Sequence, residues 1–271
     1  MPELPEVETT RRGIAKHLKG RRIREVRVHD GRLRWPVDPG MAATVTGQRM
    51  VAVQRRAKYL LLRLERGTII LHLGMSGSLR VLPQATRRLP HDHLELVLDS
   101  GQMLRLNDPR RFGSCLYTDA DPGKHVLLRR LAPEPLGRQF DAAYLHAAAH
   151  GRRVAVKQLL LNGQLVTGVG NIYASEALFR ARIRPQRRAG RLSLGDCQRL
   201  VRAVRAVLAQ AIRAGGTTLR DYVGADGNPG QFRQKLYVYE RAGRPCRVCR
   251  TPIRKLTQGQ RSSYYCPSCQ N

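Results

Sequence analysis

Hydrophobic positions change their period along the chain, and each change marks a different kind of segment. Near the N-terminus apolar side chains recur at helical spacing, at Leu4, Val7, Ile14 and Leu18. Pro5 suits the first turn of a helix, and Gly20 suits the position just after its end. The pattern therefore predicts a helix over residues 5–19.

From residue 23 to residue 117 the helical period disappears. Short runs rich in β-branched residues and leucine replace it, separated by glycine, aspartate and proline; they read REVRV, LLLRL, TIILHL, LELVL and MLRL. Several short strands without intervening helices are typical of an all-β layer structure. We predict a β-sandwich for this region.

Helical spacing returns after a segment with three prolines at residues 121–139, which we interpret as a linker. Helices are predicted over residues 153–161, from about residue 171 and from Ser193, where Asp196 completes a capping box. The helix that follows Ser193 has one apolar face, formed by Leu200, Val201, Val204, Val207, Leu208 and Ile212. A helical domain therefore follows the sandwich.

The six cysteines divide into two groups. Cys115 and Cys197 stand alone, and we expect them to be ordinary thiols. The others form two Cys-x-x-Cys pairs that are separated by 16 residues: Cys246, Cys249, Cys266 and Cys269. This spacing is typical of a zinc ribbon or finger. A disulfide framework belongs to small secreted chains, and the N-terminal sequence lacks the order of a signal peptide. We predict one structural zinc ion.

The charge balance indicates a polyanionic partner. Lys and Arg number 49 against 20 Asp and Glu, which gives a formal net charge of +29. Seven of the 49 are lysines, so 42 are arginines, whose planar fork suits phosphate and guanine. Charge alone leaves ribosomal and tRNA-linked proteins open. No apolar stretch is long enough to span a membrane, and we expect a cytoplasmic protein.

The first three residues suggest a nucleophile. Removal of Met1 would expose the secondary amine of Pro2, next to the carboxyl group of Glu3. An α-amino group has a pKa of ~7.7 to 8.0 against ~10.4 for lysine, so more of it is nucleophilic at neutral pH. Attack on a sugar C1′ would form an iminium ion and acidify the C2′ proton. On these residues alone, an ordinary exposed terminus is the simpler interpretation.

An ordered set of sequence strings resembles the formamidopyrimidine-DNA glycosylases across nearly the whole chain. The strings are PELPEVETTRRG, GRLRWP, QRRAKYLLL, HLGMSGSL, DPRRFG, PEPLG, GVGNIYASEALF, GGTTLRDYVGADG and the terminal CRVC and YCPSCQ. The resemblance implies an α+β multidomain fold. It comprises an N-terminal β-sandwich with an N-terminal helix (1–131), a helix-two-turn-helix domain (132–236) and a C-terminal zinc-finger β-hairpin (237–271).

The resemblance also implies roles for single residues. Pro2 matches the Schiff-base nucleophile and Glu3 the proton donor. Lys58 matches a lysine that contacts phosphate near the lesion and assists β-elimination, whereas a solvated surface charge is its plain alternative. Arg261 matches the arginine of phosphate binding and δ-elimination.

Further matches concern the opening of DNA. Met75, Arg110 and Phe112 match residues that fill the space left by an extruded nucleotide. Burial in the core is the alternative for Met75 and Phe112, but their glycine-bounded strings favour loops. Other expected DNA contacts are His72, His91, Arg152 and Asn171. The glycine-rich segment 216–230 matches a lesion-recognition loop.

Two positions depart from the family's usual pattern. Arg250 stands where a glycine is common after the first cysteine pair, and Glu240 interrupts a string that often reads YGR. Neither is a predicted ligand or nucleophile, so the departures concern local turn geometry.

Together these features predict a monomeric, bifunctional glycosylase and lyase acting on damaged double-stranded DNA. It would excise 8-oxoguanine and formamidopyrimidines and cleave the strand by β,δ-elimination. One alternative is an endonuclease VIII-like enzyme for oxidised pyrimidines. Another is a non-enzymatic zinc-finger protein that binds nucleic acid, which would have no need of a free Pro2 amine.

Overall fold

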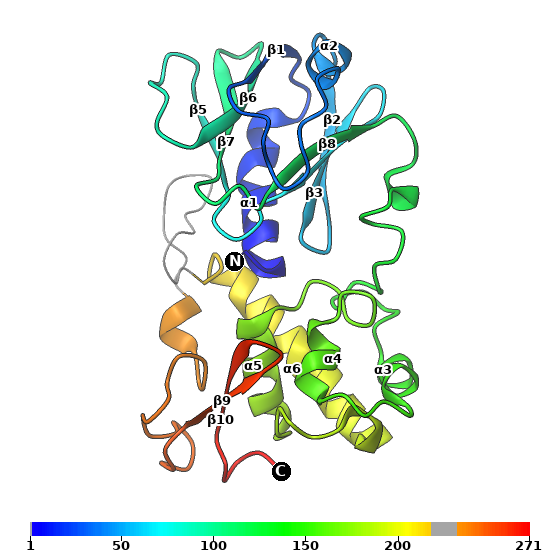
Figure 1. Cartoon of the computed structure of the whole chain (residues 1–271), viewed down its shortest axis with the longest axis vertical. Helices are drawn as coiled ribbons and strands as arrows, with labels where there is room; N and C mark the ends of the chain where they lie inside the picture. The colour runs from blue at the N-terminus through cyan, green and yellow to red at the C-terminus, as the bar shows by residue number, and fades with distance from the viewer. Residues whose placement is uncertain (1, 218–231) are drawn as a thin grey trace. The chain divides into compact units, whose positions relative to one another are not determined.

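The computed structural model describes residues 2–217 and 232–271 (Figure 1). The chain divides into two compact units. Unit 1 comprises Met1–Arg129 and Ala214–Gln231, and unit 2 comprises Arg130–Arg213 and Phe232–Asn271. Among the described residues, no helix combines the length and the apolar character needed to cross a membrane.

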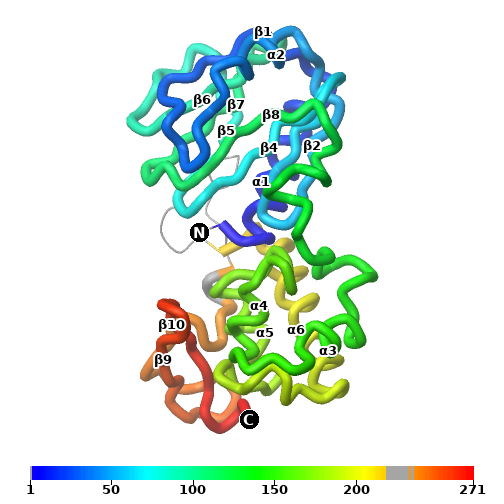
Figure 2. The backbone as a smooth tube through the Cα atoms, turned by 45° about the vertical axis from the view of Figure 1, so that its right-hand side comes forward, coloured from blue at the N-terminus to red at the C-terminus, as the bar shows by residue number. Residues whose placement is uncertain are grey.

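Unit 1 contains two antiparallel sheets of four strands each. In order across the first sheet, the strands are β1 (Ile23–Val28), β6 (Asp92–Leu98), β7 (Gln102–Asn107) and β5 (Ser78–Pro83). Across the second sheet they are β2 (Met50–Arg56), β3 (Tyr59–Leu64), β4 (Thr68–His72) and β8 (Ser114–Thr118). Figure 2 shows β5, β6 and β7 grouped on one side of the unit and β2, β4 and β8 on the other.

The core of unit 1 lies where the two sheets and the N-terminal helix meet. Alternate residues of each strand enter it; Leu94, Leu96 and Leu104 come from the first sheet, and Leu60 and Leu62 from the second. The helix α1 (Leu4–Leu18) adds its predicted apolar face, Val7, Ile14 and Leu18. The predicted sandwich with an N-terminal helix is confirmed. Two short elements, α2 (Met41–Val45) and η1 (Pro122–Lys124), complete the unit.

Unit 2 is built of helices and one terminal hairpin. Its helices are α3 (Ala142–Ala149), α4 (Val156–Leu161), α5 (Asn171–Ala181) and α6 (Leu194–Arg213), with two short 3-10 turns, η2 (Ala189–Arg191) and η3 (Phe232–Lys235). Strands β9 (Arg254–Gln258) and β10 (Arg261–Tyr265) form an antiparallel hairpin. Helix α6 packs against α3 and α5.

The predicted cap of α6 is present. The Ser193 hydroxyl accepts the backbone N–H of Asp196 at 3.1 Å, and the Asp196 carboxylate accepts the backbone N–H of Ser193 at 3.0 Å. This reciprocal pair satisfies donors that a helix start leaves unpaired. The start of a 20-residue helix is thereby fixed by a four-residue sequence signal.

Candidate functional site

The chain start is held by a buried carboxylate. Pro2 and Glu3 are buried just before α1. The Glu6 carboxylate accepts the backbone N–H of Glu3 at 2.8 Å and that of Thr217 at 2.7 Å. A β-carbon on Gly216, which has a φ of +84°, would lie 3.1 Å from this carboxylate. Glu6 therefore joins the predicted nucleophile and proton donor to residues 216–217, a link that sequence reasoning missed.

Lys58 lies in the turn between β2 and β3, close to the same helix. Arg55 in β2 donates to the carbonyl of Ala57 at 2.8 Å and to the Glu8 carboxylate of α1 at 3.2 Å. Burial raises the pKa of Glu8, but hydrogen bonds from Arg11 and neighbouring arginines outweigh it and hold that pKa at about 2. The ion pair thus fixes the lysine turn to the helix that begins beside Pro2.

His72 ends β4 with its imidazole packed against the ring of Tyr59, at a centroid distance of 4.8 Å. Its Nδ1 accepts the backbone N–H of Gly74 at 3.0 Å, so the ring proton resides on Nε2. Burial, followed by the positive charges of Lys58 and Arg34, lowers the pKa of His72 to about 4. The imidazole is therefore a neutral donor in the electrostatic field of the predicted catalytic lysine.

Met75, Arg110 and Phe112 lie on two loops of unit 1, residues 73–77 and 108–113. The side chains of Met75 and Phe112 are 39% and 41% exposed. The Arg110 guanidinium lies over the Phe112 ring, 4.9 Å from its centroid. The prediction that these are loop residues is confirmed, and burial in the core is excluded for both apolar side chains.

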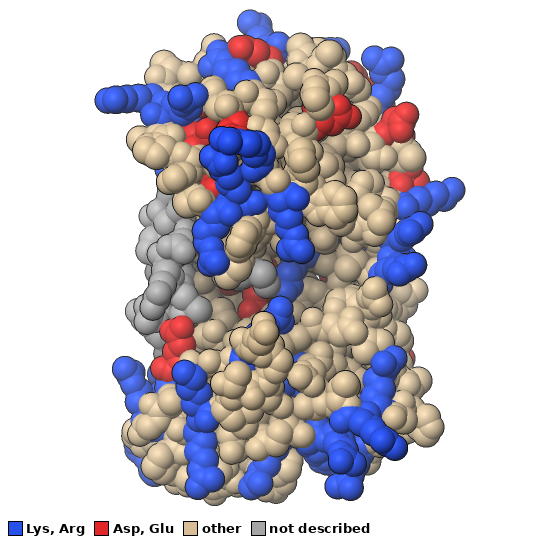
Figure 3. Space-filling model, viewed as in Figure 1, with Lys and Arg blue, Asp and Glu red and all other residues tan. Residues whose placement is uncertain are grey.

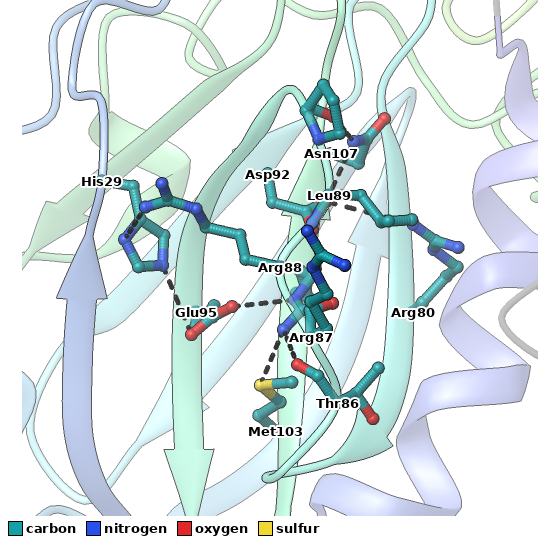
Figure 4. Close-up of polar contacts among 12 residues, drawn as sticks. His29, Arg80, Thr86, Arg87, Arg88, Leu89, Asp92, Glu95, Met103 and Asn107 are labelled. Carbon is teal, nitrogen blue, oxygen red and sulfur yellow. Dashed lines mark hydrogen bonds and ion pairs between the residues drawn. The ribbon is translucent and has the colours of Figure 1, made fainter.

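His91 ends a segment, residues 84–91, that a polar network fastens to the first sheet (Figure 4). The Arg105 guanidinium is 2% exposed and contacts the carboxylates of Asp92 and Glu95 at 3.2 and 2.8 Å. It also donates to the carbonyls of residues 86 and 87. Asn107 donates to Asp92 at 2.9 Å. His91 itself is exposed, with a φ of +69°, and its position follows from this network.

The four predicted metal ligands of unit 2 come together. The sulfur atoms of Cys246, Cys249, Cys266 and Cys269 all lie within 4.8 Å of one another. Four cysteine sulfurs at this separation fit a tetrahedral zinc ion. The isolated thiols, in contrast, are buried; burial raises the pKa of Cys115 to about 12 and is the main cause that raises that of Cys197 to about 11.

Arg261 opens β10 and is held by contacts to the next residue. The buried Lys157 of α4 donates to the carbonyl of Ser262 at 2.8 Å and to the hydroxyl of Ser263 at 2.9 Å. Asn171, the first residue of α5, donates to the same Ser262 carbonyl at 3.0 Å. Two helices therefore fix the start of the strand that presents Arg261. Lys157 was not singled out from the sequence.

Arg261 and Arg152 line one cavity of about 480 Å³ in unit 2. Its other walls include the polar side chains of Gln158, Asn162 and Gln258. An arginine predicted to bind phosphate and one predicted to contact DNA thus face a common space, although they are 109 positions apart in the sequence.

A buried carboxylate also anchors the segment that precedes the finger. Glu176 of α5 accepts the backbone N–H groups of residues 237, 238 and 239, each at 2.9 Å. Burial, partly offset by these donors, raises the pKa of Glu176. Glu240 and Arg250 have φ angles of +57° and +67°, a region that favours glycine. Both departures from the family pattern therefore occur at positions whose backbone conformation favours glycine.

The predicted residues form two groups, one in each unit. Unit 1 carries those from Pro2 to Phe112, and unit 2 carries Arg152, Asn171, Arg261 and the four cysteines. Of the predicted lesion-recognition loop 216–230, residues 218–230 lie outside the described residues.

Three family models match successive parts of the chain. They are the formamidopyrimidine-DNA glycosylase N-terminal domain at residues 1–115, the formamidopyrimidine-DNA glycosylase H2TH domain at residues 131–223, and a zinc finger found in FPG and IleRS at residues 243–271. A formamidopyrimidine-DNA glycosylase of Thioalkalivibrio sulfidiphilus is 56% identical over 270 residues, which covers 100% of both chains.

Solved structures agree with the sequence matches. The MutM (FPG) protein of Thermus thermophilus superposes with a TM-score of 0.89 at 41% identity, over 99% of this chain and 98% of that one. A complex of Lactococcus lactis Fpg with DNA containing an abasic site gives a TM-score of 0.93 at 30% identity, over 100% of both chains.

The fold, the four-cysteine centre and these matches define a zinc-finger DNA glycosylase and abasic-site lyase of base excision repair. The chain belongs to the formamidopyrimidine-DNA glycosylase family.

Proposed function

We propose that this enzyme removes oxidised purines, chiefly 8-oxoguanine and formamidopyrimidines, from duplex DNA and cleaves the strand by β,δ-elimination. The observation that carries the proposal is the junction in unit 1 where the buried Pro2 and Glu3 precede α1 and the Glu8–Arg55 pair fixes the Lys58 turn to that helix. A mutant of the Lactococcus lactis FPG has been crystallised with DNA that contains Fapy-dG, which supports the lesion class. We propose that the enzyme acts as a monomer on DNA in the cytoplasm.

The chemistry begins at the Pro2 nitrogen, which is a free amine once Met1 is removed. Its lone pair attacks C1′, the glycosidic bond breaks, and the base departs with a proton supplied by Glu3. The Pro2 nitrogen then loses its proton, and the C1′–O4′ bond breaks with transfer of a proton to O4′, which leaves an iminium ion between Pro2 and C1′. This iminium ion acidifies the C2′ proton, and removal of that proton expels the 3′ phosphate. A second elimination expels the 5′ phosphate, and water then releases Pro2 from the sugar fragment. Lys58 and Arg261 stabilise the phosphate charges through these steps.

The zinc ion takes no part in these reaction steps, and its role is structural. When bound by the four cysteine thiolates, it cross-links the finger that carries β9 and β10. That cross-link, together with Lys157, keeps Arg261 at the start of its strand.

The loop residues act on the opened duplex. Phe112 wedges beside the base left without a partner, and Met75 fills the space of the extruded nucleotide. The Arg110 guanidinium approaches the O2 and N3 acceptors of an orphaned cytosine, whereas adenine presents an N6 donor beside its N1 acceptor. We therefore expect a lesion opposite cytosine to be processed faster than one opposite adenine.

Borohydride reduction during turnover on an 8-oxoguanine duplex tests the nucleophile. We expect a covalent adduct on residue 2, in a protein whose intact mass lacks Met1, because reduction fixes the iminium ion. Acetylation of the Pro2 nitrogen should abolish the adduct, base release and nicking, while a mock-treated sample keeps all three. An adduct on a lysine, or full activity with Met1 present, would contradict this mechanism. Faster excision of an oxidised pyrimidine would assign the endonuclease VIII-like specificity instead.

A further inference from the structure

Two buried side chains join the loops that carry Met75, Arg110 and Phe112. The Ser76 hydroxyl donates to Oδ1 of Asp108 at 2.7 Å and accepts the backbone N–H of Arg110 at 3.2 Å. The second oxygen of Asp108, Oδ2, accepts the backbone N–H of Gly113 at 2.8 Å. Ser76 is 7% exposed and Asp108 is fully buried, so the two hydrogen bonds that Asp108 accepts are shielded from water.

The loop backbones also pack in direct contact. A β-carbon on Gly74, which has a φ of +59°, would lie 2.4 Å from the carbonyl carbon of Phe112 and 2.5 Å from the nitrogen of Gly113. A β-carbon on Gly113 would lie 2.7 Å from the carbonyl oxygen of His72. Such distances leave no room for a side chain. The two loops therefore form one assembly, which we call the paired loops (residues 73–77 and 108–113).

We propose that Ser76 and Asp108 are positioning residues that set where Met75 lies relative to Arg110 and Phe112. Ser76 follows Met75 in the chain and accepts the backbone N–H of Arg110, so its hydroxyl connects the two sides of the paired loops. Asp108, the first residue of the second loop, accepts the backbone N–H of Gly113, the last residue of that loop.

The consequence concerns the reading of the base opposite the lesion. A guanidinium contributes bidentate contacts only when it is aimed correctly, and a misplacement of about 1 Å can cost about 100-fold in rate. The paired loops therefore carry part of the opposite-base discrimination through residues that never touch DNA. This inference rests on the proposed role of Arg110.

The test compares Ser76→Ala and Asp108→Asn with Thr68→Val. Thr68 is a buried hydroxyl at the opposite end of β4, where it accepts a hydrogen bond from Arg63 at 3.0 Å. Replacing it with valine removes the hydrogen bond of a buried side chain in the same unit without altering the paired loops. Single-turnover excision is measured on 8-oxoguanine:cytosine and 8-oxoguanine:adenine duplexes, and melting temperatures measure the loss of stability.

We expect Ser76→Ala to lower the cytosine-to-adenine rate ratio by about fivefold or more, the range of a lost bidentate contact. Asp108→Asn should lower it as well, because an asparagine side chain has a single oxygen and can accept only one of the two hydrogen bonds that Asp108 accepts from Ser76 and Gly113. Thr68→Val should keep the wild-type cytosine-to-adenine ratio, even if its melting temperature falls as much as that of Ser76→Ala or Asp108→Asn. Asp108→Asn also provides the answer if Ser76→Ala does not fold.

Arg110→Ala distinguishes a failure of the positioning role from a failure of the proposed role of Arg110. If Arg110→Ala flattens the ratio while Ser76→Ala and Asp108→Asn retain it, the positioning role is wrong and the proposed function stands. If Arg110→Ala itself retains the ratio, the opposite base is read elsewhere and the positioning role is refuted with it. If Thr68→Val changes the ratio to the same extent, the effect is a consequence of general destabilisation and the positioning role is wrong.

Discussion

Single buried side chains determine much of the local geometry around the candidate site. Glu6, Asp108, Lys157 and Glu176 are each at most 2% exposed, and each bonds groups of a distant segment. A buried charge without partners is costly, so each of these residues fixes the segments that supply its partners. Among the predicted site residues, Arg110 and Phe112 lie in the loop that Asp108 holds, and Arg261 adjoins the residues that Lys157 binds.

His72 provides a test of the electrostatics at this scale. Its pKa of about 4 in the folded protein lies below the ~6.5 of an unperturbed histidine, because burial and the charges of Lys58 and Arg34 oppose protonation. The folded state thus binds fewer protons than the unfolded state between these values. The stability contributed by neutral His72 is complete above about pH 6.5 and is lost as the pH falls toward 4.

We therefore expect the His72 imidazole to stay neutral from pH 5 to pH 8 in nitrogen NMR spectra, with the proton on Nε2. The His72→Gln variant assigns the resonance. It should also lose less stability than the wild type when the pH is lowered from 6.5 to 4. A His72 resonance that titrates near pH 6.5, or a proton on Nδ1, would show that the Gly74 contact and the burial are described wrongly.

At the scale of elements, the sequence predicted those with strong periodicity or a cap. The helix predicted over residues 5–19 spans Leu4–Leu18, and the cap of α6 is present. Helix α4 begins at Val156 rather than at residue 153, because Ala155 pairs with Arg188 in an isolated β-bridge. Helices α2 and α3, with five and eight residues, were not predicted, since one or two turns give little periodicity.

The contacts between elements were beyond the reach of sequence patterns. Sequence strings located Met75 and Arg110 on separate loops, yet the Ser76–Asp108 bond that joins those loops spans 32 positions. The Glu6–Thr217 bond spans 211 positions. Such pairs depend on the register of the sheets and the packing of the helices, which no local pattern encodes. The family resemblance identified the candidate site residues, whereas their hydrogen-bond partners became known only from the structure.

Lys157 gives a prediction about the finger hairpin. The Lys157→Met variant keeps the apolar stem but removes the donors to Ser262 and Ser263. Leaving a buried acceptor with fewer partners costs about 1–3 kcal/mol of stability. Because the lost contacts adjoin Arg261, we expect the product of δ-elimination to decrease more than base excision does. Denaturing gels that separate β- and δ-elimination products measure both.

Lys255→Met is the matched control for this prediction. Lys255 lies exposed on β9 of the same hairpin, so its replacement removes the same charge without disturbing the anchor. Equal product ratios in the two variants would mean that charge, and not the position of the strand, determines the second elimination.

Across the whole molecule, the excess of 29 positive charges is spread over both units. Figure 3 shows basic side chains on the visible faces of unit 1 and unit 2, with acidic side chains at fewer places. Several arginines are already committed to structure; Arg55 and Arg105 bind carboxylates inside unit 1, and Arg205 of unit 2 donates to the carbonyls of Gly137 and Phe140. Net charge therefore overstates the number of phosphate contacts.

The salt dependence of DNA affinity measures how many phosphate contacts the protein makes. Each phosphate neutralised on duplex DNA releases counterions and adds ~0.9 to the slope of log affinity against log salt concentration. Lys58→Ala should therefore lower the slope by about 1 and also slow strand cleavage. Lys19→Ala, at the exposed end of α1, removes the same charge away from the lysine turn and should leave cleavage unchanged. An unaltered slope together with unaltered cleavage in Lys58→Ala would contradict both roles, whereas a reduced slope with normal cleavage would leave Lys58 as a phosphate contact alone.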